Sequence, residues 1–306
     1  MTKLIIQIPA YNEEETLGLT LSELPKSIDG IDEIEVLVID DGSTDNTVEV
    51  AKQYGANHII SLGRNCGLAK TFVTGIRAAL KLGADIIVNT DADNQYKASN
   101  IADLVKPIID RKADIVIGTR PISQIKHFSL VKKLLQKLGS WVVRLFSFTD
   151  VEDAPSGFRA MSANAAREIN IYDNFTYTLE MIIQSKVKGL SILSVPIEVN
   201  GELRPSRLFK NTLQYTIRSM FTIVRMFIVY RPFRFFTILA AILGGIGFLL
   251  GIRFLCFYFW GHGSGHVQSL ILSSIFLIIG FQTFLLAIIA DLLAINRRIL
   301  EDMKNK

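Results

Sequence analysis

The first part of the chain alternates short apolar runs with segments in which apolar residues recur at helical spacing. The apolar runs have the length of β-strands and occupy residues 3–9, 35–39, 58–62, 85–90 and 114–118. Helices are expected over residues 13–27, 67–82 and 101–111, and over a segment that ends near residue 54 with Ser43 or Thr44 as its N-cap. This alternation predicts an α/β domain with a mainly parallel, doubly wound sheet.

The pattern becomes amphipathic after residue 120. Residues 128–148 predict a helix with apolar residues on one side and lysine and arginine on the other. Such a helix can lie in a membrane interface with its apolar face down, or it can pack on the sheet; we favour the interface. Strands are expected over 156–161 and 192–199, and helices over 178–188 and 209–230.

Two long runs without charge follow, at residues 235–252 and 267–290. At about 1.5 Å of rise per residue, each can cross a hydrocarbon core about 30 Å thick. Buried helices of a larger protein are the alternative, which we disfavour. The short segment 261–266 between the runs predicts a two-helix transmembrane hairpin.

Charge and composition add an orientation to this picture. Hydrophobic residues make up 49% of the chain, and the excess lies in the hairpin; the net charge is +4. Lysine and arginine flank the hairpin on both sides but are absent from its loop, which predicts that both termini and the sheet domain are cytoplasmic. Basic residues beside apolar segments favour a membrane surface over nucleic acid as their partner. The chain has two cysteines, far apart in sequence, which argues against a disulfide framework and against a zinc site.

Polar clusters come directly after three of the predicted strands. They are PAYNEE at residues 9–14, DDGSTD at 40–45 and DADNQ at 91–95. Because open α/β sheets bind ligands outside the carboxyl ends of parallel strands, we expect the three clusters to meet in one crevice. The chain lacks the glycine-rich fingerprints of dinucleotide-binding and P-loop proteins, so those two classes lose support.

Asp91 and Asp93 are the central candidates for chemistry. Carboxylate oxygens are hard ligands that suit Mg²⁺ or Mn²⁺ held together with substrate phosphates. The alternative is an ordinary solvated turn, in which aspartate and asparagine are common.

Four motifs in order resemble glycosyltransferase family 2, and more narrowly the polyprenyl-phosphate glycosyltransferases, which include dolichyl-phosphate mannose synthase. They are PAYNEE, DGSTD at residues 41–45, DAD at 91–93 and DAPSGFR at 153–159. The hairpin is similar to that of a bacterial-type subset with a two-helix anchor. The resemblance implies a nucleotide-diphospho-sugar transferase (GT-A) fold, a divalent metal (Mg²⁺ or Mn²⁺) and inverting transfer of a hexose to polyprenyl phosphate, undecaprenyl or dolichyl, at the cytoplasmic membrane face.

The resemblance also implies roles for individual residues. Those expected to bind the nucleotide sugar are Pro9, Tyr11, Asn12, Glu13, Asp41, Arg64, Asp91, Ala92 and Gln95. Those expected to hold the metal are Asp91, Asp93 and Gln95. Those expected to meet the acceptor phosphate are Arg120, Lys133, Lys137, Ser140 and Arg204. Those expected to act in catalysis are Asp153, Asp93 and Arg207.

One departure from the family concerns the acceptor phosphate. The family usually has an arginine in the helix after the fifth strand, where this chain offers Lys133 and Lys137. Lysine acts as a point charge and does not form the bidentate fork of arginine. Asp153 matches the position of a catalytic base, but a phosphate monoester has a second pKa of about 6 and needs alignment more than deprotonation.

The expected organisation has four parts. They are a catalytic domain over residues 1–208, a juxtamembrane amphipathic helix over 209–232, a transmembrane hairpin over 233–293 and a basic tail over 294–306. A UDP-sugar resembling UDP-glucose is the favoured donor and GDP-mannose the alternative. A processive polysaccharide synthase would carry a Gln-x-x-Arg-Trp motif and more membrane helices, neither of which occurs in this sequence, and a non-catalytic membrane scaffold that binds nucleotide sugars is the rival from another class. The oligomeric state stays open, with a homo-oligomer among the options.

Overall fold

The computed structural model describes residues 1–121, 151–171, 177–201, 221, 224–225, 227–261 and 263–305. Contacts divide the chain into two compact units, Met1–Ile223 and Val224–Lys306. The predicted interface helix at 128–148 and most of the predicted helix at 209–230 lie outside the described residues.

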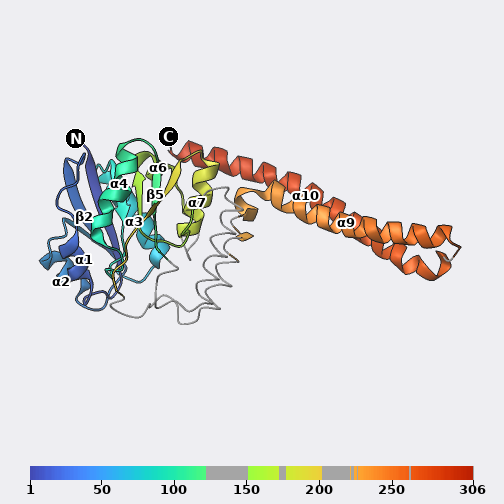
Figure 1. The fold of residues 1–306 in the computed structure, drawn as a ribbon, viewed down its shortest axis with the longest axis horizontal. Helices are drawn as coiled ribbons and strands as arrows, with labels where there is room; N and C mark the ends of the chain where they lie inside the picture. The colour runs from blue at the N-terminus through green and yellow to red at the C-terminus, as the bar shows by residue number, and fades with distance from the viewer. Residues whose placement is uncertain are drawn as a thin grey trace. The chain divides into compact units, whose positions relative to one another are not determined.

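Within the described part of the first unit, seven strands form one sheet in the order β3-β2-β1-β4-β6-β5-β7. Figure 1 draws this unit in the blue-to-yellow part of the ribbon, with β2 and β5 among the labelled elements. The strands are β1 (Lys3–Ala10), β2 (Glu33–Asp40), β3 (His58–Ser61), β4 (Ile86–Asn89), β5 (Ile115–Thr119), β6 (Arg159–Ser162) and β7 (Ile192–Pro196). The helices are α1 (Leu17–Glu23), α2 (Thr47–Gln53), α3 (Leu68–Lys81), α4 (Ile101–Ile109), α6 (Ala163–Glu168) and α7 (Tyr177–Val187), with the short 3₁₀ turn η1 (Ala98–Asn100) before α4. The sheet is mainly parallel, as predicted.

The one antiparallel strand in this sheet, β6, decides which loops meet. It pairs with β4 on one side and β5 on the other, so Arg159 lies opposite both Asn89 and Ile117. Because β6 runs against its neighbours, the loop before it lies at the edge where β1, β2, β4 and β5 end. Residues 153–158 therefore join the polar clusters that follow the parallel strands.

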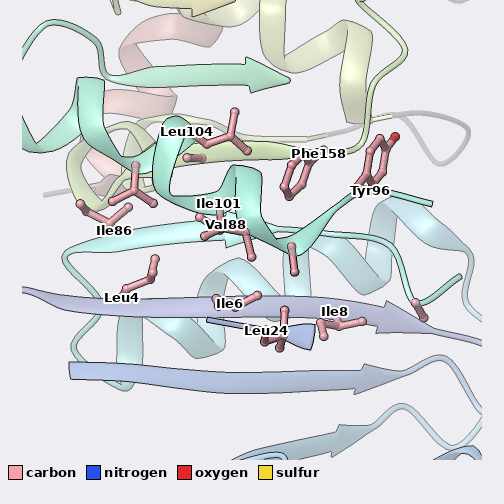
Figure 2. Close-up of a cluster of buried hydrophobic side chains, with 14 of the residues drawn as sticks. Leu4, Ile6, Ile8, Leu24, Ile86, Val88, Tyr96, Ile101, Leu104 and Phe158 are labelled. Carbon is pink, nitrogen blue, oxygen red and sulfur yellow. The ribbon is translucent and has the colours of Figure 1, made fainter. Parts of the chain in front are cut away.

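Both faces of the sheet are covered by helices, which makes its strands apolar on both sides. Leu4, Ile6 and Ile8 of β1 point into a core that contains Val88 and Ile101 (Figure 2). Helices α1, α2 and α4 supply residues to this core. The intervening Ile5 points to the opposite core, which is supplied by α3, α6 and α7. The run at residues 3–9 is thus a central strand that is buried from Leu4 onward.

Several predicted boundaries were wrong because polar residues make tertiary bonds at element ends. Helix α1 begins at Leu17 and not at residue 13, because the preceding loop binds the 43–47 loop. Helix α2 begins at Thr47 after Asn46, so neither Ser43 nor Thr44 is its N-cap. Strand β6 begins three residues later than predicted, and β7 ends at Pro196. Val199 instead forms an isolated bridge with Tyr96.

The second unit contains the helical hairpin predicted from the two apolar runs. Its helices are α9 (Pro232–Phe259) and α10 (Val267–Asn305), joined through η2 (Gly263–His266). Pro232–Phe259 and Val267–Arg297 are long and apolar enough to cross a membrane, with mean hydropathies of 2.4 and 2.3 over their most apolar windows. Large apolar side chains such as Phe248 and Leu249 are exposed. This exposure supports membrane association.

Small residues bring α9 and α10 into close contact. The Ser273 hydroxyl donates to the carbonyl oxygen of Gly247 across the interface, at 2.6 Å. A Cβ on Gly280 would lie 3.0 Å from the backbone nitrogen of Gly244. Small residues that let helix backbones approach are typical of helix pairs in lipid, where packing and hydrogen bonds drive association.

Candidate active site

The loops after β1 and β2 are joined to each other by hydrogen bonds. The backbone N–H of Asn12 donates to Ser43 Oγ at 2.9 Å, and the backbone N–H of Thr44 donates to Asn12 Oδ1 at 2.8 Å. The backbone N–H of Glu13 donates to Thr47 Oγ1 at 2.8 Å. Asn12 has a φ of 55°, a conformation that asparagine tolerates better than most residues. The two motifs, at residues 9–14 and 40–45, therefore form one rim held together by hydrogen bonds.

Two of the predicted nucleotide-binding residues, Pro9 and Tyr11, belong to this rim, and a third, Ala92, lies in the loop after β4. Pro9 is buried at the end of β1, whereas the Tyr11 side chain is exposed, at 40%. Ala92, from the loop after β4, is buried, and its carbonyl oxygen accepts from Thr20 Oγ1 at 3.0 Å. Of these three, Tyr11 is the side chain that offers a ring to a ligand.

Asp41 holds the neighbouring loop in place. Its carboxylate is buried and accepts the backbone N–H groups of Cys66 and Gly67, at 2.7 and 2.9 Å. Gly42 has a φ of +75°, and a Cβ there would lie 2.5 Å from the Arg64 backbone. The tight approach places Arg64, whose side chain is exposed, beside Asp41. Contact of either residue with a nucleoside stays a prediction.

The loop after β4 is tied to the segment that follows β7. Asp93 Oδ1 accepts the backbone N–H of Gln95 at 3.1 Å, which closes a tight turn. The carbonyl oxygen of Gln95 accepts the backbone N–H of Asn200 at 2.8 Å, and the Asn200 amide donates to the Asn94 carbonyl at 3.0 Å. Asp91 and Asp93 are half-buried on this turn.

The electrostatics of the Asp91–Asp93 pair favour a cation. Burial, with the nearby charge of Asp93 as a second cause, raises the pKa of Asp91 to about 7. A divalent ion would relieve this repulsion, and carboxylate oxygens with the Gln95 amide oxygen are the hard donors that Mg²⁺ and Mn²⁺ prefer. The residues present therefore fit such an ion. This set has two carboxylates and one amide. A group of three or more histidine, cysteine, aspartate or glutamate side chains that could hold a metal is not found among the described residues.

Arg120 and Asp153 form a buried ion pair at the same edge. Arg120 Nε donates to Asp153 Oδ2 at 2.7 Å, and a terminal guanidinium nitrogen donates to Oδ1 at 3.0 Å. The Asp153 side chain is fully buried, and that of Arg120 is 10% exposed. Burial would lower the pKa of Arg120, but the nearby Tyr96, Asp153 and Asp91 outweigh it and raise that pKa. Arg120 thus lies in the field of the candidate catalytic Asp153 and of the candidate metal ligand Asp91.

Gly157 brings the loop before β6 against Asp91. A Cβ on Gly157 would lie 3.0 Å from Asp91 Oδ1 and 3.3 Å from the Tyr177 hydroxyl. The Asn89 amide donates to the Gly157 carbonyl at 2.8 Å and to the Tyr177 hydroxyl at 3.1 Å. The backbone N–H of Gly157 donates to the Tyr96 hydroxyl at 3.3 Å. The carbonyl of Gly157 is therefore bound by Asn89 and its N–H by Tyr96, which holds the loop in place.

Arg159 lies under the same loop and is fully buried. Burial lowers its pKa to about 10. Sequence reasoning gave no role to Arg159, Asn89, Tyr96, Gly157 or Tyr177. Gly157 and Arg159 lie in the SGFR part of the fourth motif, which could have pointed to them. Asn89, Tyr96 and Tyr177 lie outside the four motifs and are buried polar residues in apolar surroundings, so no motif pointed to them.

The structure brings together Glu13, Asp41, Asp91, Asp93, Arg120 and Asp153 at one sheet edge. The sequence predicted that the clusters after β1, β2 and β4 meet there, but it did not predict that Asp153 joins them. The remaining predicted residues, Lys133, Lys137, Ser140, Arg204 and Arg207, lie outside the described residues.

Comparison with known proteins agrees with this architecture. The chain is 31% identical over 212 residues to an undecaprenyl-phosphate mannosyltransferase of Micrococcus luteus, covering 66% of this chain and 85% of the relative. It is 30% identical over 213 residues to a UDP-N-acetylglucosamine–dolichyl-phosphate N-acetylglucosaminyltransferase of Methanococcus voltae, covering 62% and 83%. A crystal structure of glucosyl-3-phosphoglycerate synthase from Mycobacterium tuberculosis with Mn²⁺, UDP-glucose and phosphoglyceric acid has a TM-score of 0.59 at 19% identity, covering 74% of this chain and 80% of that chain.

The sheet with its single antiparallel strand, the acidic turn after β4 and these neighbours define the GT-A class of glycosyltransferase fold. The model of the family described as glycosyl transferase family 2 matches residues 5–170. The chain belongs to this family and is a glycosyltransferase.

Proposed function

We propose that this protein transfers one sugar from a nucleoside diphosphate sugar to a polyprenyl phosphate at a membrane surface, with inversion at the anomeric carbon. The observation that carries the proposal is the meeting of the Asp91–Asp93 turn and the Arg120–Asp153 pair at one sheet edge. The chain also has two apolar helices that suit a lipid environment. Relatives that are named as polyprenyl-phosphate sugar transferases support the acceptor class.

In the proposed reaction, an oxygen of the acceptor phosphate attacks the anomeric carbon while the bond from that carbon to the diphosphate oxygen breaks. The bonding electrons leave with the nucleoside diphosphate, and the lipid phosphate becomes a glycosyl phosphodiester. The acceptor monoester has a second pKa of about 6, so it is mostly a dianion at neutral pH. Asp153, held by Arg120, would orient the acceptor or sugar hydroxyls and take any residual proton.

The donor would lie between the rim and the acidic turn. Tyr11, Glu13 and Asp41 would bind the nucleoside at the ends of β1 and β2. Asp91, Asp93 and Gln95 would hold Mg²⁺ or Mn²⁺, which neutralises charge on the leaving diphosphate. The crowding of the two carboxylates supports this assignment.

The membrane position follows from the hairpin. Basic residues precede the uncharged run at 235–252 and follow the one at 267–290, and none lies in the segment 261–266, so the positive-inside rule favours cytoplasmic termini and a cytoplasmic site. In this arrangement the lipid phosphate would reach the transferase unit from the cytoplasmic leaflet.

Two donor classes are to be compared. UDP-glucose, or a related UDP-sugar, is favoured by the resemblance of the hairpin to a bacterial-type subset, and the archaeal relative is named for a UDP-sugar. GDP-mannose is the second candidate, favoured by the relative named as a mannosyltransferase.

The test is transfer by the purified full chain in detergent, with undecaprenyl phosphate, Mn²⁺ and each of UDP-glucose, UDP-N-acetylglucosamine and GDP-mannose. We expect one radiolabelled donor to give a glycosyl lipid, and we expect Asp93→Asn to lower the rate about 1000-fold because the leaving charge is no longer neutralised. Equal lipid product from wild type and Asp93→Asn would refute the site. Nucleotide-sugar binding without product from any donor would favour the scaffold alternative.

A further inference from the structure

We propose that Arg159 is a positioning residue for glycosyl transfer: it holds the loop 153–157 so that Asp153 keeps its place at the sheet edge. The inference rests on the proposed function, because its readout is transfer. It concerns a side chain that is fully buried beneath the loop.

The guanidinium of Arg159 makes three short hydrogen bonds to backbone carbonyl oxygens. Nε donates to Ser156 at 2.7 Å, and one terminal nitrogen donates to Ala154 at 2.6 Å. The other terminal nitrogen donates to Thr178 at 2.8 Å, at the start of α7. Each nitrogen thus meets a different carbonyl. A planar fork with five fixed N–H donors is the side chain that can do this, and lysine cannot.

These three bonds join elements that carry the candidate chemistry. Ala154 and Ser156 lie between Asp153, which binds Arg120, and Gly157, where an added Cβ would lie 3.0 Å from Asp91 Oδ1. Thr178 follows Tyr177, whose hydroxyl accepts from Asn89 and lies beside Gly157. Movement of the loop would therefore shift Asp153 and its ion pair with Arg120.

The position of Arg159 in the sheet makes it a fixed reference point. It is the first residue of β6 and lies opposite Asn89 of β4 and Ile117 of β5. Its guanidinium also lies 5.9 Å from the centroid of the Tyr177 ring. Burying a cation costs free energy even when its donors are satisfied, so stability alone does not account for it. The hydrogen bonds of Arg159 tie the loop 153–157 to the first residue of β6.

The first test is Arg159→Lys in the full chain, with Arg167→Lys as the matched control. Arg167 is an exposed arginine of α6 whose bond goes to Asn164. We expect Arg159→Lys to lower kcat about 100-fold, the loss typical of a displacement of about 1 Å at a reacting centre. The KM for the donor and the binding of free nucleotide should stay unchanged, because the rim at Asn12 and Asp41 is untouched.

A double-mutant cycle separates positioning from general stability. If Arg159 acts through Asp153, the double variant Arg159→Lys with Asp153→Asn will be no slower than Asp153→Asn alone. Multiplication of the two losses in kcat, or wild-type kcat in Arg159→Lys, overturns the inference.

Gly157→Ala gives an independent test if Arg159→Lys does not fold. The added Cβ, 3.0 Å from Asp91 Oδ1, pushes the loop while leaving Arg159 in place, so kcat should fall. Unchanged kcat in a folded Gly157→Ala overturns the inference. Absence of product from the wild-type protein with every donor would instead refute the proposed function.

Discussion

Two carboxylates at opposite ends of the same sheet have pKa values shifted in opposite directions. Glu35 lies in β2 near the starting edge; burial would raise its pKa, but hydrogen bonds from Lys3 and His58 outweigh this and lower it. Asp91 follows β4 at the other edge, where burial and the charge of Asp93 raise its pKa to about 7. The carboxylate at the starting edge is stabilised by basic partners, whereas the one at the ending edge faces the charge of Asp93, as the proposed cation site requires.

The largest expected effect is at the ending edge. Asp91→Asn removes one of two crowded carboxylates and a ligand of the proposed ion, so we expect transfer to fall about 1000-fold. The melting temperature of the metal-free protein should stay level or rise, because the repulsion from Asp93 is gone. Radiolabelled transfer and thermal unfolding in detergent measure the two. A variant that is inactive and also melts earlier would show that the comparison between the edges is wrong.

The buried ion pair at the ending edge should behave differently from the acidic turn. Arg120→Met removes the bidentate partner of a fully buried Asp153, and loss of one member of a buried pair typically costs about 3–5 kcal/mol. We expect a lower melting temperature together with slower transfer. Arg111→Met, at an exposed arginine after α4, is the control and should change neither. An unchanged melting temperature in Arg120→Met would show that the ion pair contributes little to the free energy of unfolding.

The smallest expected effect is at the starting edge and depends on pH. Because the pKa of Glu35 is lowered from 4.5 in the folded protein, its contribution to stability is present above 4.5 and is lost as the pH falls through the lowered value. Glu35→Gln should therefore lower the melting temperature modestly at neutral pH, by the equivalent of about 1 kcal/mol, and should lose less stability than wild type on acidification. Transfer at neutral pH should be unaffected. An identical fall in melting temperature on acidification in wild type and Glu35→Gln would contradict this account.

The fold was largely predictable because strands that are buried on both faces leave a continuous apolar signal. Residues 3–9 and 85–90 were recognised on this basis, and both lie in the sheet. The ends of elements were less predictable. Ser43 has the chemistry of an N-cap, but its hydroxyl accepts the Asn12 N–H from a loop 31 residues away. Local propensity does not report such a bond.

The candidate site was also predictable only in part. The clusters after β1, β2 and β4 could be assigned to one edge because parallel strands end together. The order of β6, between β4 and β5 and antiparallel to both, could not be read from the sequence, and it is this order that brings Asp153 to the edge. The support from Arg159, Asn89 and Tyr177 was equally hidden, because a buried polar residue has no sequence pattern that names its partner.

The α/β class, the family and the two apolar helices could be read from the linear chain, because periodicity, motif order and hydropathy are properties of the sequence. The pairing of Arg120 with Asp153, the close approach of Gly157 to Asp91 and the three carbonyls around Arg159 became visible only in the folded protein. These contacts depend on strand order and burial, which set the distances between side chains and the strength of their charges.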